Sequence, residues 1–331
     1  MKQPFSRRDF LGTTIAATAA GSLSAADEST QPIPTRILGK TGAKVTIIAM
    51  GCGNRWLSYG SEDSALEALN LALDSGIGYL DTAYGYNRGQ SETWVGKVMK
   101  SRRKEVFLAT KIEPRNGDEA MKLLDNALKR LQTDQIDLIS VHSLTNEDDL
   151  AQIEAKDGIL NTLYKLREQK VTRFVGITSH TDPVVLKTAL ERHDFDCCQM
   201  ALNAALQGMR AAGGGNMGIN PAIKTSFELV ALPVAVKKNL GIIGMKMMAQ
   251  DALLDAGPRQ KDPAKLFRYT LSLPIATAII GMPKHEHIVQ NAKWARAFTP
   301  LSTTEMKEFS RQTAEQYKAS IDLKFDGHID A

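Results

Sequence analysis

The chain has 331 residues, of which 43% are apolar and 24% charged, and its formal net charge is +4. This composition excludes a disordered chain, a collagen-like chain and a polytopic membrane protein, and it is typical of a globular protein. Its three cysteines exclude a disulfide scaffold, and so small a net charge gives no reason to expect a nucleic-acid partner.

The amino-terminal segment has the pattern of an export signal. Ser6–Leu11 is an arginine pair followed by Phe-Leu, and Thr13–Ala25 is a mildly apolar stretch ending in small residues before Asp27. That stretch is too short for a bilayer, which takes about 20 residues, so we expect no membrane span in the mature chain. A disordered basic tail is the alternative. We predict export by the twin-arginine machinery to the periplasm, with a signal peptide at 1–26 and one mature domain at 27–331.

Eight short runs rich in apolar and β-branched residues alternate with helical patterns along the mature chain. We predict strands at Val45–Met50, Gly78–Asp81, Val106–Lys111, Ile136–His142, Phe174–Thr178, Cys197–Ala201, Leu240–Met245 and Thr277–Gly281. We predict helices at Ser64–Leu73, Glu119–Leu131, Leu160–Gln169, Pro183–Glu191, Ala264–Leu273 and Ser302–Ser320. Eight strand–helix units in about 250 residues predict an α/β protein with a single-domain (β/α)8 TIM-barrel fold.

A doubly wound sheet is the alternative fold, but no GxGxxG motif follows the first strand. That spacing occurs once, at Gly213, Gly215 and Gly218, in a long connection after the sixth strand, and we interpret it as a surface or lid loop. His285 and His287 resemble a metal-binding pair, but no third ligand follows at a recognisable spacing. We therefore predict neither a Rossmann domain nor a metal site.

Three successive predicted strands end in a polar residue, where a TIM barrel places its chemistry. The second ends at Asp81, with Tyr86 in the turn that follows, the third at Lys111 and the fourth at His142. Asp81 and Lys111 on adjacent strands would compensate each other, which matters because an unpaired buried charge is costly. A nearby ammonium lowers the pKa of a phenol from its usual value of about 10, so Tyr86 becomes a usable proton donor. These residues together predict carbonyl reduction, with His142 orienting the substrate.

Several motifs between about residues 35 and 295 share their spacing with one known family. They are Asp81-Thr82-Ala83-x-x-Tyr86, Glu92, Val95-Gly96, Ala109-Thr110-Lys111, Asp137-Leu138-x-x-x-His142, Gly176–His180, Gln199 and Ile280–Pro283. The chain resembles the aldo-keto reductases. This resemblance implies an NAD(P)-dependent oxidoreductase that transfers hydride between nicotinamide and a carbonyl or alcohol substrate, such as an aldehyde, a ketone or a sugar. It also implies that Tyr86 is the general acid, that Lys111 and Asp81 tune it, and that His142 orients the carbonyl.

The resemblance further implies where the dinucleotide binds. Ser179 and His180 match a Ser-Asn pair that holds the nicotinamide amide, with His in place of Asn, and Gln199 matches a second contact to that amide. Where the family often stacks an aromatic residue on the ring, this chain has Met245 and then Lys246. Met245 either covers the ring or is a core residue. The positions matching the adenosine end are Gly281, Lys284, His287, Gln290 and Asn291.

The family's arginine for the adenosine phosphate is absent, and Lys284 and His287 are weaker clamps, so NADP is expected and NAD is the alternative cofactor. Two other functions remain open. A non-catalytic cofactor-binding sensor or partner subunit would keep the pocket, and a Schiff-base aldolase would use Lys111 as nucleophile. Trp56 and Tyr59, after the first strand, are candidates either for a substrate wall or for packing in the core.

Overall fold

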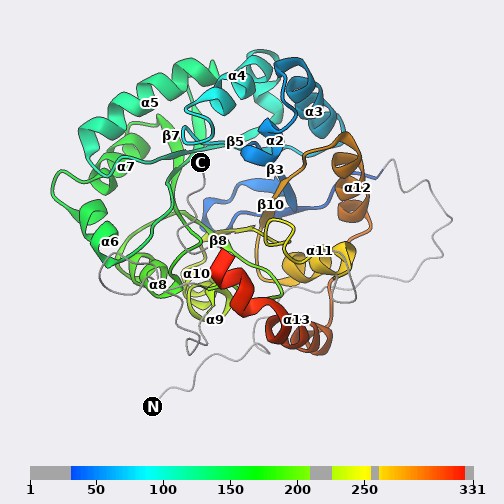
Figure 1. Cartoon of the computed structure of the whole chain (residues 1–331). Coiled ribbons are helices and arrows are strands. Elements are labelled where there is room, and N and C mark those ends of the chain that lie inside the picture. The colour runs from blue at the N-terminus through cyan, green and yellow to red at the C-terminus, as the bar shows by residue number, and fades with distance from the viewer. Residues whose placement is uncertain (1–30, 209–225, 255–260, 325–331) are drawn as a thin grey trace. The chain divides into compact units, whose positions relative to one another are not determined.

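The computed structural model describes residues 31–208, 226–254 and 261–324. Within these ranges eight parallel strands close into a barrel in the order β10-β3-β4-β5-β6-β7-β8-β9, and helices surround them (Figure 1). The barrel strands are β3 (Ile48–Gly51), β4 (Tyr79–Asp81), β5 (Phe107–Ile112), β6 (Ile136–Val141), β7 (Thr172–Ser179), β8 (Cys197–Ala201), β9 (Gly241–Met245) and β10 (Thr277–Gly281). The predicted (β/α)8 TIM-barrel fold is confirmed.

Helices follow most of the barrel strands. The longer ones are α3 (Glu62–Asp74), α4 (Gln90–Arg102), α5 (Gly117–Leu131), α6 (Glu147–Glu154), α7 (Ile159–Glu168), α8 (Pro183–Arg192), α11 (Pro263–Ser272), α12 (His285–Arg296) and α13 (Thr303–Lys324). The shorter ones are α2 (Asn54–Leu57), α9 (Phe227–Val230), α10 (Leu232–Lys237), η1 (Gly39–Thr41) and η2 (Arg103–Glu105). None of the helices in the described ranges is long and apolar enough to cross a bilayer.

Side-chain caps fix where several helices begin. Asp182 accepts hydrogen bonds from the backbone N–H groups of Val184 and Val185 at 2.8 and 3.2 Å, and Pro183 occupies the first helical position of α8. A proline there loses no hydrogen bond, because that N–H has no partner inside the helix. Ser61 caps α3 in the same way. The start of α8 at Pro183 is as predicted, whereas the cap at Ser61 makes α3 begin at Glu62, two residues before the predicted Ser64.

The prediction of one strand over Val45–Met50 is wrong. The chain bends at Ile47, and β2 (Lys44–Thr46) pairs antiparallel with β1 (Thr35–Ile37) outside the barrel. The Thr46 hydroxyl donates to the Ile48 carbonyl at 2.8 Å across this bend. A continuous apolar run does not reveal such a bend. Val45, before the bend, is buried under the barrel, and Ile48–Gly51, after the bend, is buried as a strand of the barrel wall.

The β1–β2 hairpin contributes to the core inside the barrel. Leu38 and Val45 are buried in one cluster with Tyr79 and Phe107, which are the first residues of β4 and β5. The hairpin therefore closes the amino end of the barrel with apolar side chains. Polar side chains are left for the carboxyl end of the strands, where the predicted site lies.

Candidate active site

The carboxyl ends of β4 and β5 bring three of the predicted residues into contact. The Lys111 ammonium donates to Asp81 Oδ2 at 2.6 Å, to the Thr82 carbonyl at 3.0 Å and to Tyr86 Oη at 3.1 Å. An ammonium has three hydrogens, so these three contacts use all of its donors. All of these side chains are buried. The structure thus places the phenol beside a lysine that is itself held by a carboxylate.

Lys111 is charged in this environment. Burial alone would lower its pKa, but the Asp81 carboxylate and the Tyr86 oxygen outweigh burial, so the pKa lies above its ordinary value. A Schiff-base nucleophile needs the neutral amine with a free lone pair. The ion pair with Asp81 therefore argues against the aldolase alternative.

The turn after β4 fixes Tyr86 over this lysine. Asn87 and Arg88 both have a φ of 51°, and Gly89 has a φ of 87°, so three residues in a row adopt left-handed backbone conformations. On the opposite side, a Cβ at Gly53 would lie 3.3 Å from Tyr86 Cζ. The absence of that Cβ lets the chain before α2 approach the ring closely.

His142 follows β6 and completes the group. Its ring lies edge-on to that of Tyr86, with 5.8 Å between the centroids and 86° between the planes. Its Nδ1 lies 2.8 Å from Glu113 Oε1. Glu113 was not predicted, although its position two residues after Lys111 puts both side chains on one side of an extended segment. That alternation is the signal that would have found it.

Two carboxylates of the family motifs, Asp137 and Glu92, contact neighbouring strands and helices and not the Tyr86 cluster. Asp137 is buried, accepts from the Leu108 N–H at 2.8 Å and pairs with Arg103 at 2.8 Å. Glu92 is fully buried and accepts from Thr110 at 2.6 Å and from Arg130 at 2.8 Å. Burial raises the pKa of Glu92, while Thr110 and Arg130 oppose that effect. These residues stabilise the barrel wall around the site.

The predicted nicotinamide contacts at the end of β7 are buried. Ser179 Oγ donates to the Leu144 carbonyl at 2.7 Å, which joins β7 to the loop after His142. His180, the next residue, is fully buried. Both residues therefore lie at the same end of the barrel as Tyr86: Ser179 is the last residue of β7, which pairs with β6, and His180 follows it.

Gln199 and Met245, on neighbouring strands β8 and β9, contact each other. The amide nitrogen of Gln199 donates to the Met245 sulfur at 3.4 Å, and a thioether is a weak acceptor. Lys246 follows with a φ of 59°, and its carbonyl accepts from Asn203 at 3.1 Å. The amide N–H of Gln199 is thus bound to a weak acceptor, the Met245 sulfur.

The positions predicted for the adenosine end lie around the start of α12. Asn291 is buried, whereas the others are exposed: Gly281, Lys284, His287 and Gln290. Lys284 is the residue before the first turn of α12, and its side chain makes no capping hydrogen bond. The structure therefore places Lys284 at a helix N-terminus that has no side-chain cap. Gln290 and Asn291 differ, because Gln290 is exposed and Asn291 is buried.

The two aromatic residues that were candidates for a substrate wall or for packing both pack against other rings. Trp56 is fully buried, donates to the Ala65 carbonyl at 3.0 Å and packs edge-on against Trp94. Tyr59 packs against His285 with 5.2 Å between the centroids, and burial together with Glu286 raises the pKa of Tyr59 to about 12. Trp56 is thus a core residue, because the short helix α2 directs its indole inward, toward Ala65 and Trp94.

The other motifs give no site among the described residues. No group of three or more His, Cys, Asp or Glu side chains in residues 31–208, 226–254 and 261–324 is placed to hold a metal ion. The motif of Gly213, Gly215 and Gly218 lies outside these ranges, as does the predicted signal at 1–26. Cys52 is buried beside Asp81, and burial is the main reason why its pKa is raised.

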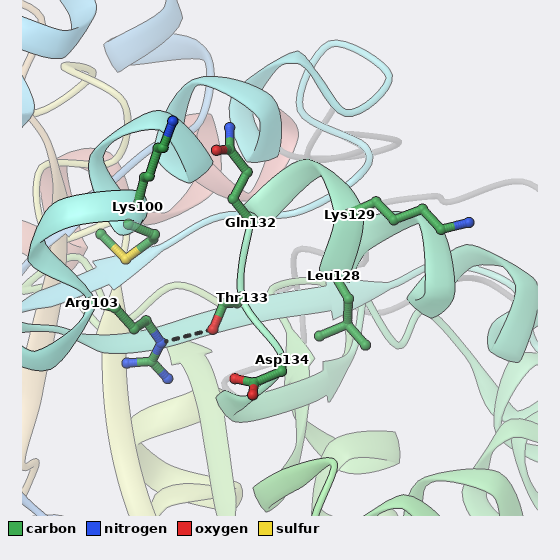
Figure 2. A pocket seen from close by; sticks show the side chains of 8 residues that line it. Lys100, Arg103, Leu128, Lys129, Gln132, Thr133 and Asp134 are labelled. Atoms are coloured by element: carbon green, nitrogen blue, oxygen red, sulfur yellow. Dashed lines mark hydrogen bonds between the residues drawn. The ribbon is translucent and has the colours of Figure 1, made fainter.

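The surface of the described chain is hollowed at several places, among them the following. One of about 580 Å³ lies between the ends of α4 and α5 and contains none of the predicted site residues (Figure 2). In it Arg103 donates to Thr133 at 3.3 Å, the dashed contact in Figure 2, while also pairing with Asp137. Another, of about 500 Å³, lies between α2 and the turn after β4, and it is lined by Asn54, Leu57, Ser58, Gly85, Asn87 and Arg88, without Tyr86 or the other residues of the predicted site.

Known proteins resemble the chain along most of its length. It is 27% identical over 313 residues to the uncharacterised oxidoreductase YqkF of Bacillus subtilis, covering 86% of this chain and 98% of that one. It is 28% identical over 244 residues to L-galactose dehydrogenase of Arabidopsis thaliana, covering 70% of each. An aldo-keto reductase of Klebsiella pneumoniae solved in complex with NADPH has the same fold, with a TM-score of 0.66, 23% identity and coverage of 84% of this chain and 94% of that one.

The model of the aldo/keto reductase family matches residues 48–268, which is more than half of the chain. The match contains the strand ends that carry Asp81, Lys111 and His142, and also the turn with Tyr86. The chain therefore belongs to the aldo/keto reductase family, and the predicted class, an NAD(P)-dependent oxidoreductase of carbonyl compounds, is confirmed.

Proposed function

We propose that the chain reduces a small polar aldehyde or ketone, sugars included, with NADPH, and that Tyr86 donates the proton. The observation that carries the proposal is the buried ammonium of Lys111, which contacts Asp81 at 2.6 Å and Tyr86 Oη at 3.1 Å. A free phenol is a weak acid, with a pKa of about 10. An ammonium beside its oxygen stabilises the phenolate that proton donation leaves behind.

Each side chain of the cluster then has one task. When bound, NADPH supplies the hydride that the carbonyl carbon accepts. Tyr86 donates its proton to the carbonyl oxygen, and Lys111 stabilises the resulting negative charge. Asp81 keeps Lys111 charged and directed at Tyr86. His142, edge-on to Tyr86, holds the carbonyl oxygen from the other side.

The residues at the ends of β7 to β9 suit the carboxamide of a nicotinamide. Gln199 donates to a sulfur at 3.4 Å, so a carbonyl oxygen would be a better partner for it. Ser179 gives its own hydrogen to Leu144, and its oxygen, which accepts the Thr181 N–H at 3.4 Å, has a second lone pair for an amide N–H. We propose that these two residues and His180 hold the carboxamide, with Met245 and Lys246 beside the ring.

The start of α12 suits a phosphate and so favours NADP over NAD. The first N–H groups of a helix have no partners within the helix and attract anions. Lys284 adds a positive charge there, and its side chain leaves the first turn uncapped. The NADPH bound to the Klebsiella pneumoniae relative supports the same choice. The contacts that we propose for this end are Gly281, Lys284, His287, Gln290 and Asn291.

The hollow between α2 and the turn that carries Tyr86 has a polar lining on which a hydroxylated substrate could extend. Its lining includes the amides of Asn54 and Asn87, the hydroxyl of Ser58 and the guanidinium of Arg88. Such groups exchange hydrogen bonds with sugar hydroxyls. The likeness to an L-galactose dehydrogenase points the same way.

Loss of NADPH absorbance in the presence of carbonyl compounds tests the proposed function. We expect turnover of about 1 to 10³ s⁻¹ on one or more members of a panel of aldoses, hydroxylated aldehydes and ketones. A parallel series with NADH measures the cofactor preference, which we expect to favour NADPH. NADPH binding without turnover on the whole panel would contradict the proposal and support the sensor alternative.

We also propose that residues 1–26 direct the folded enzyme to the periplasm through the twin-arginine machinery. The arginine pair, the Phe-Leu after it and the small residues before Asp27 support this. The test replaces Arg7 and Arg8 by lysine in the full chain, which keeps the charge. In a Gram-negative host we expect the unchanged chain in the periplasmic fraction and the lysine variant as uncleaved cytoplasmic precursor. Equal export of both would contradict the signal.

A further inference from the structure

Glu113 connects the two residues that face the substrate carbonyl in the proposed function. It follows β5, and its Oε1 lies 2.8 Å from His142 Nδ1. The same oxygen accepts the backbone N–H of Gly85, the residue before Tyr86, at 2.9 Å. One carboxylate oxygen therefore links the ring of His142 to the turn that carries Tyr86.

The hydrogen bond to Glu113 determines which nitrogen of His142 carries a hydrogen. Burial would raise the pKa of Glu113, but the hydrogen bond and charge of His142 lower it, so this carboxyl is ionised near neutral pH. An ionised carboxylate only accepts hydrogen bonds, so Nδ1 of His142 must be the donor. A neutral ring with its hydrogen on Nδ1 has none on Nε2. Only the doubly protonated ring can therefore donate from Nε2 to a carbonyl oxygen.

Two cations near His142, Lys111 and Arg115, are each paired with a carboxylate. Lys111 pairs with Asp81 at 2.6 Å beneath Tyr86. Arg115, which donates to the His142 carbonyl at 2.8 Å, pairs with Asp149 at 2.6 Å.

On the β7 side, the backbone N–H of Ser143, the residue after His142, donates to the uncharged hydroxyl of Thr178 at 2.8 Å. The second oxygen of Glu113 is buried and accepts no hydrogen bond from the described residues. The charge of Glu113 is thus directed mainly at His142.

We propose that Glu113 is a positioning residue that keeps His142 doubly protonated, so that the ring donates from Nε2 to the substrate carbonyl while Tyr86 gives up its proton. This inference rests on the proposed function. Glu113 itself touches neither substrate nor cofactor and acts through His142. Its removal should therefore change the pH range of activity more than the activity at low pH.

The variant Glu113→Gln tests the charge while keeping the shape. Its amide oxygen can still accept the Gly85 N–H, so the turn is retained. Ring resonances of His142, assigned with a His142→Asn variant, report its pKa by NMR without any substrate. We expect the pKa of His142 to lie above the usual value of about 6.5 and to fall by about one pH unit or more in Glu113→Gln. An unchanged pKa would overturn the inference.

The kinetic arm compares kcat for carbonyl reduction at about pH 5.5 and about pH 8. At the lower pH both enzymes have a protonated His142, so we expect values within about twofold. At the higher pH we expect the variant to be slower by about tenfold, since its His142 is then mostly neutral. Both enzymes contain Tyr86, so the effect of its own titration largely cancels when kcat of the variant is divided by kcat of the unchanged enzyme at the same pH. A ratio that does not change with pH would overturn the positioning role.

Glu154→Gln is the matched control. Glu154 pairs with His193 Nε2 at 2.6 Å, a contact of the same kind made outside the candidate site. We expect its kcat to equal that of the unchanged enzyme at both pH values. If the unchanged enzyme reduces no carbonyl compound, the proposed function fails, and the NMR titration still decides whether Glu113 sets the charge of His142.

Discussion

Replacing Tyr86 by phenylalanine is expected to lower kcat for carbonyl reduction by about 10²- to 10⁴-fold, the range that general acids contribute. The substitution removes one oxygen atom, which is the atom 3.1 Å from the Lys111 ammonium. The ring remains packed against Gly53 and edge-on to His142. NADPH affinity should therefore change little, because none of the proposed cofactor contacts involves the phenol.

Two measurements make this result specific. Fluorescence titration with NADPH should give similar dissociation constants for Tyr86→Phe and the unchanged enzyme, and steady-state kinetics should place the loss in kcat. Tyr84→Phe is the matched control, since Tyr84 lies two residues earlier and packs under Arg130, 4.9 Å from its ring centroid. We expect Tyr84→Phe to keep its activity. Undiminished turnover in Tyr86→Phe would exclude Tyr86 as the proton donor.

The meeting of Asp81, Lys111 and His142 around Tyr86 was predictable because barrel topology turns spacing along the chain into proximity in space. In a closed parallel barrel all strands present their carboxyl ends at one rim. A polar residue at the end of each of three successive strands therefore has to meet the others there, as Asp81, Lys111 and His142 do. The contact distances follow from the register, which pairs Asp81 with Ala109, two residues before Lys111 on the same face.

What the sequence did not reveal depends on contacts between distant segments. The bend at Ile47 exists because β2 pairs with β1, and a periodic apolar pattern contains no information on that pairing. Trp56 is buried because α2 turns its indole toward Ala65. Glu113 was not predicted because it lies two residues beyond the end of the predicted strand Val106–Lys111, where the apolar pattern no longer indicates which way a side chain points.

The residues proposed to contact the cofactor could be predicted only from the resemblance to the family. Gln199 and Met245 lie on neighbouring strands, so their contact follows from the barrel order. The exposure of Gln290 against the burial of Asn291 follows from helical geometry, in which consecutive residues point about 100° apart. Which of these residues touches the adenosine end depends on ligand contacts and not on periodicity.

The variant Lys111→Met is expected to lower the free energy of unfolding by about 3–5 kcal/mol and to reduce kcat strongly. It leaves the Asp81 carboxylate buried without the cation that contacts it at 2.6 Å, and an uncompensated buried charge costs about that much. Urea unfolding at neutral pH measures the change.

Asp81 in this variant should take up a proton more readily than in the unfolded chain. A carboxyl whose folded pKa is raised in this way destabilises the protein above its unfolded pKa, and the penalty is relieved as the pH falls through the folded value. The difference in stability between Lys111→Met and the unchanged enzyme should therefore shrink toward about pH 4.

The double variant Asp81→Asn/Lys111→Met separates stability from catalysis. Removing both charges eliminates the buried uncompensated carboxylate, so we expect the double variant to regain about 2 kcal/mol or more over Lys111→Met. Its kcat should stay as low as that of the single variant, because no ammonium remains to stabilise the Tyr86 phenolate. If activity returned together with stability, the role of Lys111 would be structural, and the contact of its ammonium with Tyr86 Oη would not contribute to proton transfer.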